Sequence, residues 1–331
     1  MITSADIILI TGGTGSFGNA LVDKLLSLPS PPNKIIIYSR DELKQYDMAN
    51  KYENHDTLRF FIGDVRDKER LSKALKGVDT VFHAAALKQV PACEYNPEEA
   101  VKTNILGSMN LIDTCIENKV RKVVALSSDK AVHPVNLYGA TKLVSEKLFV
   151  SANAQGNRET RFVVVRYGNV LASRGSVLQL FKEQLKTGTL TITDPYMTRF
   201  WWTLPEAVQF VIDVHIHSTG GEIYVPPIQS TDMGTFAKAV IVRYGNKSKA
   251  CNFKITGTRP GEKVHEVLIA SDEASRTHDF GWCYIVFPSL KFFSIDTHHQ
   301  CPVLEQFTYT SDKHFMTVDD LVLKFTSLDS C

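Results

Sequence analysis

Residues 6–18 read Asp-Ile-Ile-Leu-Ile-Thr-Gly-Gly-Thr-Gly-Ser-Phe-Gly, and this stretch decides the fold. Its apolar run from Ile7 to Ile10 is typical of a buried strand, and the apolar residues that follow as far as Leu26 recur at helical spacing. The turn between the two elements contains Gly12, Gly15 and Gly18. Glycines in that position let the backbone approach a pyrophosphate at the helix N-terminus, so the stretch predicts a dinucleotide-binding site.

The same alternation continues along the first half of the chain. Further strands are predicted over residues 34–38, 58–62, 80–83 and 123–126, and helical patterns separate the strands up to about residue 166. Because such units wind in the right-handed sense, we expect an α/β fold of the Rossmann type with a doubly wound parallel sheet. Residues 1–170 are expected to form the dinucleotide-binding domain. Residues 171–331 are expected to form mainly a smaller substrate-binding lobe, with some later segments returning to the first domain.

The end of the second strand favours NADP over NAD as the dinucleotide. This strand ends in Ser39-Arg40-Asp41, and Arg40, with Ser39 and Lys44, suits a 2′-phosphate. After the third strand, Asp64 is expected to accept a hydrogen bond from the adenine amino group. The other predicted cofactor contacts are Thr14, Ser16 and Phe17 in the glycine turn, Val65, and the small residues Ala84, Ala85 and Ala86 after the fourth strand.

Proton-transferring groups gather within residues 127–142. Ser127-Ser128-Asp129-Lys130 follows the fifth predicted strand, and Tyr138 lies four residues before Lys142. On a helix these two residues share a face, so the lysine ammonium is expected to favour the phenolate of Tyr138. One serine, Ser127 or Ser128, is expected to bridge a substrate hydroxyl and the phenol. The set predicts an active site at a strand's carboxyl end, with Tyr138 as base and with both Tyr138 and Lys142 also contacting the cofactor.

Together these motifs resemble the extended short-chain dehydrogenase/reductase family. Within that family, residues 128–142 look like the inverting UDP-N-acetylglucosamine 4,6-dehydratases. Other similar segments are residues 38–45, 86–91, 94–97, 197–201 and 259–263, and the resemblance extends from residue 7 to about residue 270. Simple sugar epimerases of the family keep the Ser-Tyr-Lys set without the Asp129-Lys130 pair, so this pair is the specific part of the match.

The resemblance implies a dehydration of UDP-N-acetylglucosamine that regenerates its NADP. Tyr138 would take the proton of the 4-hydroxyl as C4 is oxidised, and the resulting ketone would acidify the C5 proton. Lys130 is expected to remove that proton, its pKa lowered by burial and neighbouring cations, while Asp129, kept protonated by burial, protonates the departing 6-hydroxyl. Reprotonation of C5 from the opposite face would give an L-arabino 4-keto-6-deoxy sugar for a deoxy-amino sugar of a surface glycan.

The resemblance also implies the contacts to the UDP-sugar. Arg199 and Arg259 would hold the diphosphate through bidentate guanidinium contacts, and Glu262 would accept from a ribose hydroxyl. Lys88 matches a position near the sugar or the cofactor, although a lysine there also suits a solvated helix start. Asn169, Arg174 and Val177 would complete the sugar-nucleotide site. Residues 271–301 depart most from the family pattern, so no contact is predicted from them.

Two alternative functions follow from the same residues. A UDP-hexose 4-epimerase or a 4-keto-sugar reductase would need Tyr138 and Lys142 but not Asp129 and Lys130. A protein that senses NADP without turnover would be expected to have lost part of the Ser-Tyr-Lys set, and no member of that set is missing.

Composition also limits the binding partners and the cellular compartment that we expect for the protein. The net charge of the 331-residue chain is +1, without long charged runs, which disfavours nucleic acid or an anionic membrane as partner. Its six cysteines form no close pairs, so neither a metal site nor a disulfide framework is predicted, and a reducing cytoplasm is expected. No signal peptide is visible, and no apolar run approaches the roughly 20 residues that a membrane span requires. The long helices predicted over residues 97–118 and 136–152 are expected to pair in a homodimer or higher homo-oligomer, as in relatives.

Overall fold

A nine-stranded sheet forms the centre of the computed structural model, which describes residues 2–155, 159–173, 175–246, 251–289 and 303–329. In spatial order its strands are β14 (Thr277–Asp279), β15 (Tyr284–Val286), β10 (Ile223–Val225), β6 (Arg161–Val165), β5 (Lys122–Leu126), β4 (Thr80–His83), β1 (Ile7–Thr11), β2 (Lys34–Ser39) and β3 (Leu58–Ile62). All neighbours from β10 to β3 are parallel, and β15 and β14 add an antiparallel edge. The predicted parallel sheet is confirmed.

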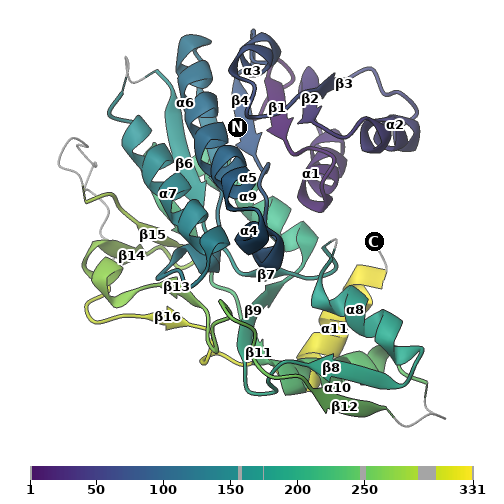
Figure 1. Cartoon of the computed structure of the whole chain (residues 1–331). Helices are drawn as coiled ribbons and strands as arrows, with labels where there is room; N and C mark the ends of the chain where they lie inside the picture. Colours follow the sequence, from purple (N-terminus) through teal and green to yellow (C-terminus); the bar gives the residue numbers. More distant parts are fainter. Residues whose placement is uncertain (1, 156–158, 174, 247–250, 290–302, 330–331) are drawn as a thin grey trace.

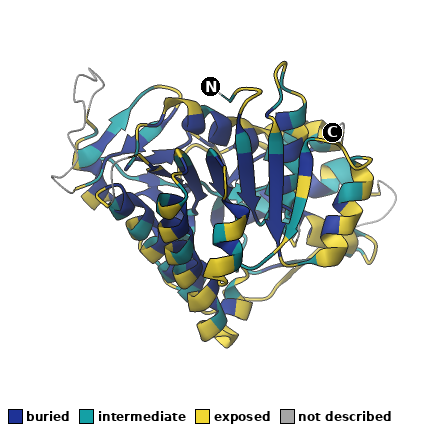
Figure 2. Cartoon of the chain, turned by 90° about the horizontal axis from the view of Figure 1, so that it is seen from above, coloured by how far each residue is buried: buried dark blue, intermediate teal, exposed yellow. Residues whose placement is uncertain are grey.

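Helices cover both faces of this sheet. Right-handed crossovers place α1 (Ser16–Leu26) and α2 (Glu42–Lys51) on one face, and α3 (Lys68–Ala74), α6 (Gly107–Glu117) and α7 (Leu137–Ala152) on the other. On the first face, α9 (Leu204–His217) packs against α1. Strands β1, β2 and β5 are almost entirely buried between these layers, which is why their sequences are continuous apolar runs (Figure 2).

The predicted helix over residues 97–118 is interrupted. It consists of α5 (Pro97–Val101), a wide π turn η1 (Lys102–Leu106) and α6, and it is preceded by the short α4 (Val90–Tyr95). Asn104 lies in the π turn, where its side chain accepts from the Leu87 amide and donates to the Leu87 carbonyl and the Thr141 hydroxyl. The amide therefore ties the segment after β4 to helix α7, which is a structural role.

A smaller lobe lies beyond the carboxyl end of the parallel strands (Figure 1). It contains α8 (Val177–Leu185), β8 (Thr189–Ile192), α10 (Met233–Tyr244), β12 (Asn252–Ile255) and α11 (Val318–Asp329). Its own core includes Phe181, Trp201, Phe236 and Phe325. A sheet of β7 (Asn169–Val170), β9 (Thr198–Trp202) and β11 (Ser230–Asp232), and the pair β13 (Val267–Ile269) with β16 (Tyr309–Thr310), connect the lobe to the main body.

Segments of the second half also belong to the main body. Strands β10, β14 and β15 lie in the central sheet, and the short helix η3 (Ser271–Arg276) precedes β14. Arg166, at the end of β6, is fully enclosed and pairs with Glu146 of α7 at 2.8 Å and with Glu273 of η3 at 2.7 Å. This buried triad joins η3 to the first half of the chain. The domain boundary at residue 170 itself stays a prediction. In the part of the chain that the structure describes, no helix is long and apolar enough to cross a membrane.

Candidate active site

A cavity of about 930 Å³ opens where the strand order reverses between β1 and β4. Open α/β sheets bind ligands at this point, outside the carboxyl ends of the strands. The cavity runs from the glycine turn after β1 to residues of the smaller lobe such as Val177. Its volume lies at the upper end of the range for small-molecule sites.

The glycine turn has no space for side chains at its closest approach. Gly12 has a φ of +65°, and a Cβ atom there would lie 2.9 Å from the backbone of Ala85. The turn therefore packs directly on the small residues that follow β4. All the predicted cofactor residues line the cavity: Gly12, Thr14, Gly15, Ser16, Phe17, Gly18, Ser39, Arg40, Lys44, Asp64, Val65, Ala84, Ala85, Ala86, Tyr138 and Lys142. The wall is thus shaped for an extended ligand that lies against backbone, as a dinucleotide does.

The far end of this wall carries a cation. The Arg40 guanidinium is half exposed and lies 3.6 Å from the Asp64 carboxylate. Asp41 is the N-cap of α2, where its carboxylate accepts from the Lys44 amide at 3.0 Å and pairs with the Lys44 ammonium. Asp64 is held by two side-chain hydrogen bonds from Arg66. These pairings leave Arg40 as the group best placed to meet an added negative charge.

Asp129 and Lys130 form a tight pair in the turn η2 (Asp129–Ala131). Their charged atoms, Lys130 Nζ and Asp129 Oδ1, lie 3.0 Å apart, and the Ser128 hydroxyl donates to the same carboxylate oxygen at 2.9 Å. The turn packs against the start of α7 because that helix carries Gly139, where a Cβ atom would lie 2.2 Å from the Lys130 carbonyl oxygen. Lys130 and Ser128 line the cavity, whereas Asp129 is fully buried and is not among the lining residues.

The expectation that the pKa of Lys130 is lowered is wrong. Burial alone lowers the pKa of the lysine, but the carboxylates of Asp129 and Glu266 outweigh burial and raise it. These two carboxylates therefore favour the ammonium form of Lys130. The sequence could not show this, because Glu266 is far away along the chain and reaches the site only through the tertiary fold.

Tyr138 and Lys142 share the inner face of α7, as their spacing predicted. Burial raises the pKa of Tyr138 to about 12, against the opposing effects of the Lys130 charge and a hydrogen bond with Ser128. Lys142 donates to the Leu126 carbonyl at 2.5 Å, and burial lowers its pKa to about 8. The cation with the largest effect on the phenol is therefore Lys130 rather than Lys142, because the Lys142 ammonium is held at the end of β5.

Predicted substrate contacts divide into two groups. Lys88, Asn169 and Val177 line the cavity. Arg199 does not: its guanidinium is mostly buried and donates to the carbonyls of Thr198 and Val264. Arg259 is largely exposed, 3.6 Å from Glu262, and neither residue lines the cavity. Arg174 lies outside the described residues. The roles of all seven residues stay predictions.

Several polar atoms in the cavity wall are buried without a hydrogen-bond partner in the described part of the chain. They are Thr103 Oγ1, Ser127 Oγ, Asn169 Oδ1, Ser176 Oγ and Trp201 Nε1. A buried polar group without a partner costs free energy, on the order of 1–3 kcal/mol each. Their concentration around one cavity indicates a polar ligand that supplies the missing partners.

Two lining residues, Tyr167 and Thr103, were not singled out from the sequence. Tyr167 follows the end of β6, so the position of that strand could have identified it. Thr103 lies in the π turn, which the sequence pattern does not predict. Trp201 stacks on Phe236 with ring centroids 4.3 Å apart, so it belongs mainly to the core of the smaller lobe. In residues 271–289, the described part of the divergent segment, no residue lines the cavity.

Comparisons with known proteins agree with this geometry. Residues 8–288 match the family model described as polysaccharide biosynthesis protein. An inverting UDP-N-acetylglucosamine 4,6-dehydratase of Campylobacter jejuni subsp. jejuni is 51% identical over 318 residues, which are 93% of this chain and 92% of that protein. A UDP-glucose 4-epimerase of Rickettsia canadensis is 46% identical over 281 residues, which are 84% of this chain and 81% of that protein.

Solved structures show the same fold. The X-ray structure of Pen from Bacillus thuringiensis superposes with a TM-score of 0.91 at 34% identity, covering 99% of this chain and 100% of that one. A dTDP-glucose 4,6-dehydratase of Streptomyces venezuelae, solved with NAD bound, reaches a TM-score of 0.70 at 22% identity, covering 78% of this chain and 86% of that one. At that identity the second likeness speaks for the fold alone.

Proposed function

The chain belongs to the polysaccharide biosynthesis protein family of extended short-chain dehydrogenase/reductases, and we infer from this membership and from its site that it catalyses the 4,6-dehydration of UDP-N-acetylglucosamine with inversion at C5. The single observation that carries this inference is the Asp129-Lys130 pair beside Tyr138, with Lys130 on the cavity wall. An oxidation at C4 alone needs only a tyrosine and its neighbours. Removing a C5 proton and a 6-hydroxyl needs a second base and an acid.

Tyr138 is the base in the first proton transfer that we propose. Its phenolate form accepts the proton of the sugar's 4-hydroxyl, and Lys130 and Ser128 are the groups of this chain that favour the phenolate. A nicotinamide dinucleotide, when bound, would supply hydride exchange between C4 and C6 of the sugar. Residues from Gly12 to Gly18 and from Ala84 to Ala86, which border the cavity, would hold that dinucleotide against the backbone.

The second stage uses the Asp129-Lys130 pair. Moving one proton from the Lys130 ammonium to the Asp129 carboxylate, across 3.0 Å, breaks an N–H bond and forms an O–H bond. This single shift produces the amine that removes the C5 proton and the acid that protonates the leaving hydroxyl. Asp129 does not line the cavity. The Ser128 hydroxyl contacts Asp129 and borders the cavity, so it provides the path for the proton from Asp129 to the leaving hydroxyl. After water leaves, lysine and aspartate are again a charged pair.

We further propose NADP rather than NAD as the dinucleotide, because Asp41 is engaged as a helix cap while Arg40 faces the cavity. Replacing Arg40 with alanine is expected to weaken NADP binding by about tenfold to a hundredfold, the worth of a charge-assisted hydrogen bond, and to leave NAD binding unchanged. Calorimetric titration of cofactor-free protein measures both. Arg59→Ala, on β3 and away from the cavity, is the control. Equal weakening of NADP and NAD would contradict the assignment.

The proposed reaction is tested by mass spectrometry and proton NMR of UDP-sugars after incubation with the protein. Loss of one water from UDP-N-acetylglucosamine is the expected result. Conversion of UDP-glucose or UDP-N-acetylglucosamine to an isomer of unchanged mass would favour the epimerase alternative, which the name of the Rickettsia relative raises. No change in any UDP-sugar, with NADP present, would favour a sensing protein.

We also propose that copies of the chain associate through α5, η1, α6 and α7. Exposed apolar side chains support this surface, and they are Val101, Leu106, Met109 and Val144. Sedimentation velocity is expected to show a dimer or larger species, and a monomer at micromolar concentration would contradict the proposal. A reducing compartment such as the cytoplasm is our proposal for its location, supported by the free thiols of Cys93, Cys115, Cys251 and Cys283.

A further inference from the structure

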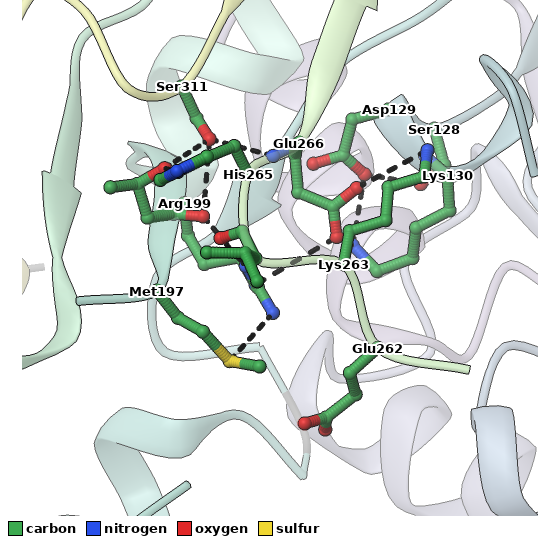
Figure 3. Close-up of polar contacts among 12 residues, drawn as sticks. Ser128, Asp129, Lys130, Met197, Arg199, Glu262, Lys263, His265, Glu266 and Ser311 are labelled. Carbon is green, nitrogen blue, oxygen red and sulfur yellow. Dashed lines mark hydrogen bonds and ion pairs between the residues drawn. The ribbon is translucent and has the colours of Figure 1, made fainter. Parts of the chain in front are cut away.

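Glu266 lies against the catalytic lysine without lining the cavity. It directly precedes β13, its side chain is 3% exposed, and its Oε1 atom lies 3.4 Å from Lys130 Nζ. The backbone at Glu266 is fixed by two hydrogen bonds with Ser311, one from the Glu266 amide to the Ser311 hydroxyl and one from the Ser311 amide to the Glu266 carbonyl. Figure 3 shows Glu266 between Lys130 and Arg199, while Glu262 points away from this group. The carboxylate is thus placed rigidly.

Cations surround Glu266 on its other sides. Arg199 Nε lies 3.8 Å from Oε1, and Lys263 Nζ lies 3.8 Å from Oε2. Lys263 also donates to the Val132 carbonyl, which fixes it beside the turn η2. In the described part of the chain Oε2 has no hydrogen-bond partner, so Glu266 interacts mainly through its charge. Burying a carboxylate costs free energy unless nearby cations pair with its charge.

The field at Lys130 is the sum of several groups on different elements. Asp129 and Glu266 favour its ammonium, and Arg199 disfavours it. Lys263, before β13, and Lys88, after β4, are cations whose charges also act on Lys130 and whose pKa values Lys130 lowers in return. Tyr138 of α7 faces the lysine as well. Of these groups, Glu266 is the carboxylate to which no step of the reaction has been assigned.

We propose that Glu266 is a positioning residue for the dehydration, which holds the Lys130 amine beside Asp129 and makes it a stronger base toward the C5 proton. Removal of that proton turns the amine into an ammonium, and the Glu266 charge stabilises this product of the step. Lys263 and Arg199 limit the effect from the opposite side of the carboxylate. Glu266 itself exchanges no proton in the cycle, because Asp129 is the partner within hydrogen-bond distance of Lys130. The proposal rests on the proposed function.

Two variants with opposite expected effects test this role. Glu266→Gln keeps the shape and removes the charge, so the Lys130 amine should be neutral more often and should react roughly threefold or more faster with trace acetic anhydride at fixed pH. Lys263→Met removes a cation, so the same reaction should slow by a similar factor. Mass spectrometry measures labelling of Lys130 relative to the exposed Lys186 of the same protein. The control is Asp272→Asn, which replaces an exposed carboxylate paired with His133. This variant should leave the labelling rates of Lys130 and Lys186 unchanged.

A kinetic measurement links the labelling to the reaction. The limb of the pH profile for deuterium entry at C5 that rises with pH reports the deprotonation of Lys130. It should move to lower pH by about one unit or more in Glu266→Gln and to higher pH in Lys263→Met, while Glu266→Asp should return it toward the wild-type position. Shifts in the same direction, or unchanged labelling in folded Glu266→Gln protein, would overturn the proposal. If Glu266→Gln does not fold, the Lys263→Met variant alone tests the proposal. Unchanged or faster labelling of Lys130 in that variant would then overturn the proposal. If the wild-type protein releases no water from UDP-N-acetylglucosamine, the proposed function fails, while the labelling still reports on Glu266.

Discussion

Replacing Tyr138 with phenylalanine is expected to lower the turnover of UDP-N-acetylglucosamine by about a thousandfold or more. In the proposed mechanism the Tyr138 phenolate accepts the 4-hydroxyl proton, and without it the ketone that acidifies C5 does not form. Phenylalanine fills the same buried volume on the inner face of α7, so the variant should fold as the wild type does. The measurement is the rate of water loss from the sugar, with cofactor binding followed separately.

The matched control for this variant is Tyr196→Phe. Tyr196 is 79% exposed and does not line the cavity, so its turnover should remain within a factor of two or so of the wild type. A Tyr138→Phe protein that kept more than about a tenth of the wild-type rate would show that another group takes the first proton. It would also remove the basis for placing the reaction at the start of α7.

Replacing Asp129 with asparagine is expected to separate two steps that the wild type performs together. Loss of water should fall by about a hundredfold to ten-thousandfold, because asparagine cannot protonate the departing 6-hydroxyl. The Lys130 amine remains beside the cavity and loses the nearest carboxylate that stabilises its ammonium. Deuterium should therefore still enter C5 of the recovered UDP-sugar in deuterated water. Proton NMR and mass spectrometry of the same sample measure the two steps.

The outcomes for Asp129→Asn discriminate between roles of the pair. Simultaneous loss of water release and C5 exchange, in a protein that remains folded and binds NADP, would show that Asp129 is needed for the base as well as for the acid. Wild-type rates of both would exclude Asp129 from the reaction. Asp272→Asn again serves as the control, since its carboxylate is exposed and lies outside the cavity wall.

The cofactor half of the site could be predicted from the sequence because its signals are local. The glycine turn and the residues at the ends of β2, β3 and β4 are fixed by short segments, and all the predicted cofactor residues line the cavity. The same local reasoning placed Tyr138 and Lys142 on one helix face. The family and the reaction class that these motifs predicted are confirmed by the matching family model and by the 51% identical dehydratase.

The charges around Lys130 could not be predicted, because they come from distant parts of the chain. The tertiary fold brings Glu266, Arg199 and Lys263 to η2 from positions far along the chain. Motif reasoning placed Arg199 on a diphosphate, whereas its guanidinium is bound to backbone carbonyls beside Glu266. The wide turn at η1 was also absent from the sequence pattern. Side chains whose partners lie far along the chain are where sequence reasoning was least informative.

The central claim is that this chain removes the C5 proton of a 4-keto sugar and then expels the 6-hydroxyl. Proton NMR of UDP-N-acetylglucosamine incubated with the protein in deuterated water, without added cofactor, tests it most directly. The account predicts a new C6 methyl group, deuterium at C5 and a C5 coupling pattern of the inverted sugar. A product with only its C4 centre inverted, and with hydrogen retained at C5, would contradict the account.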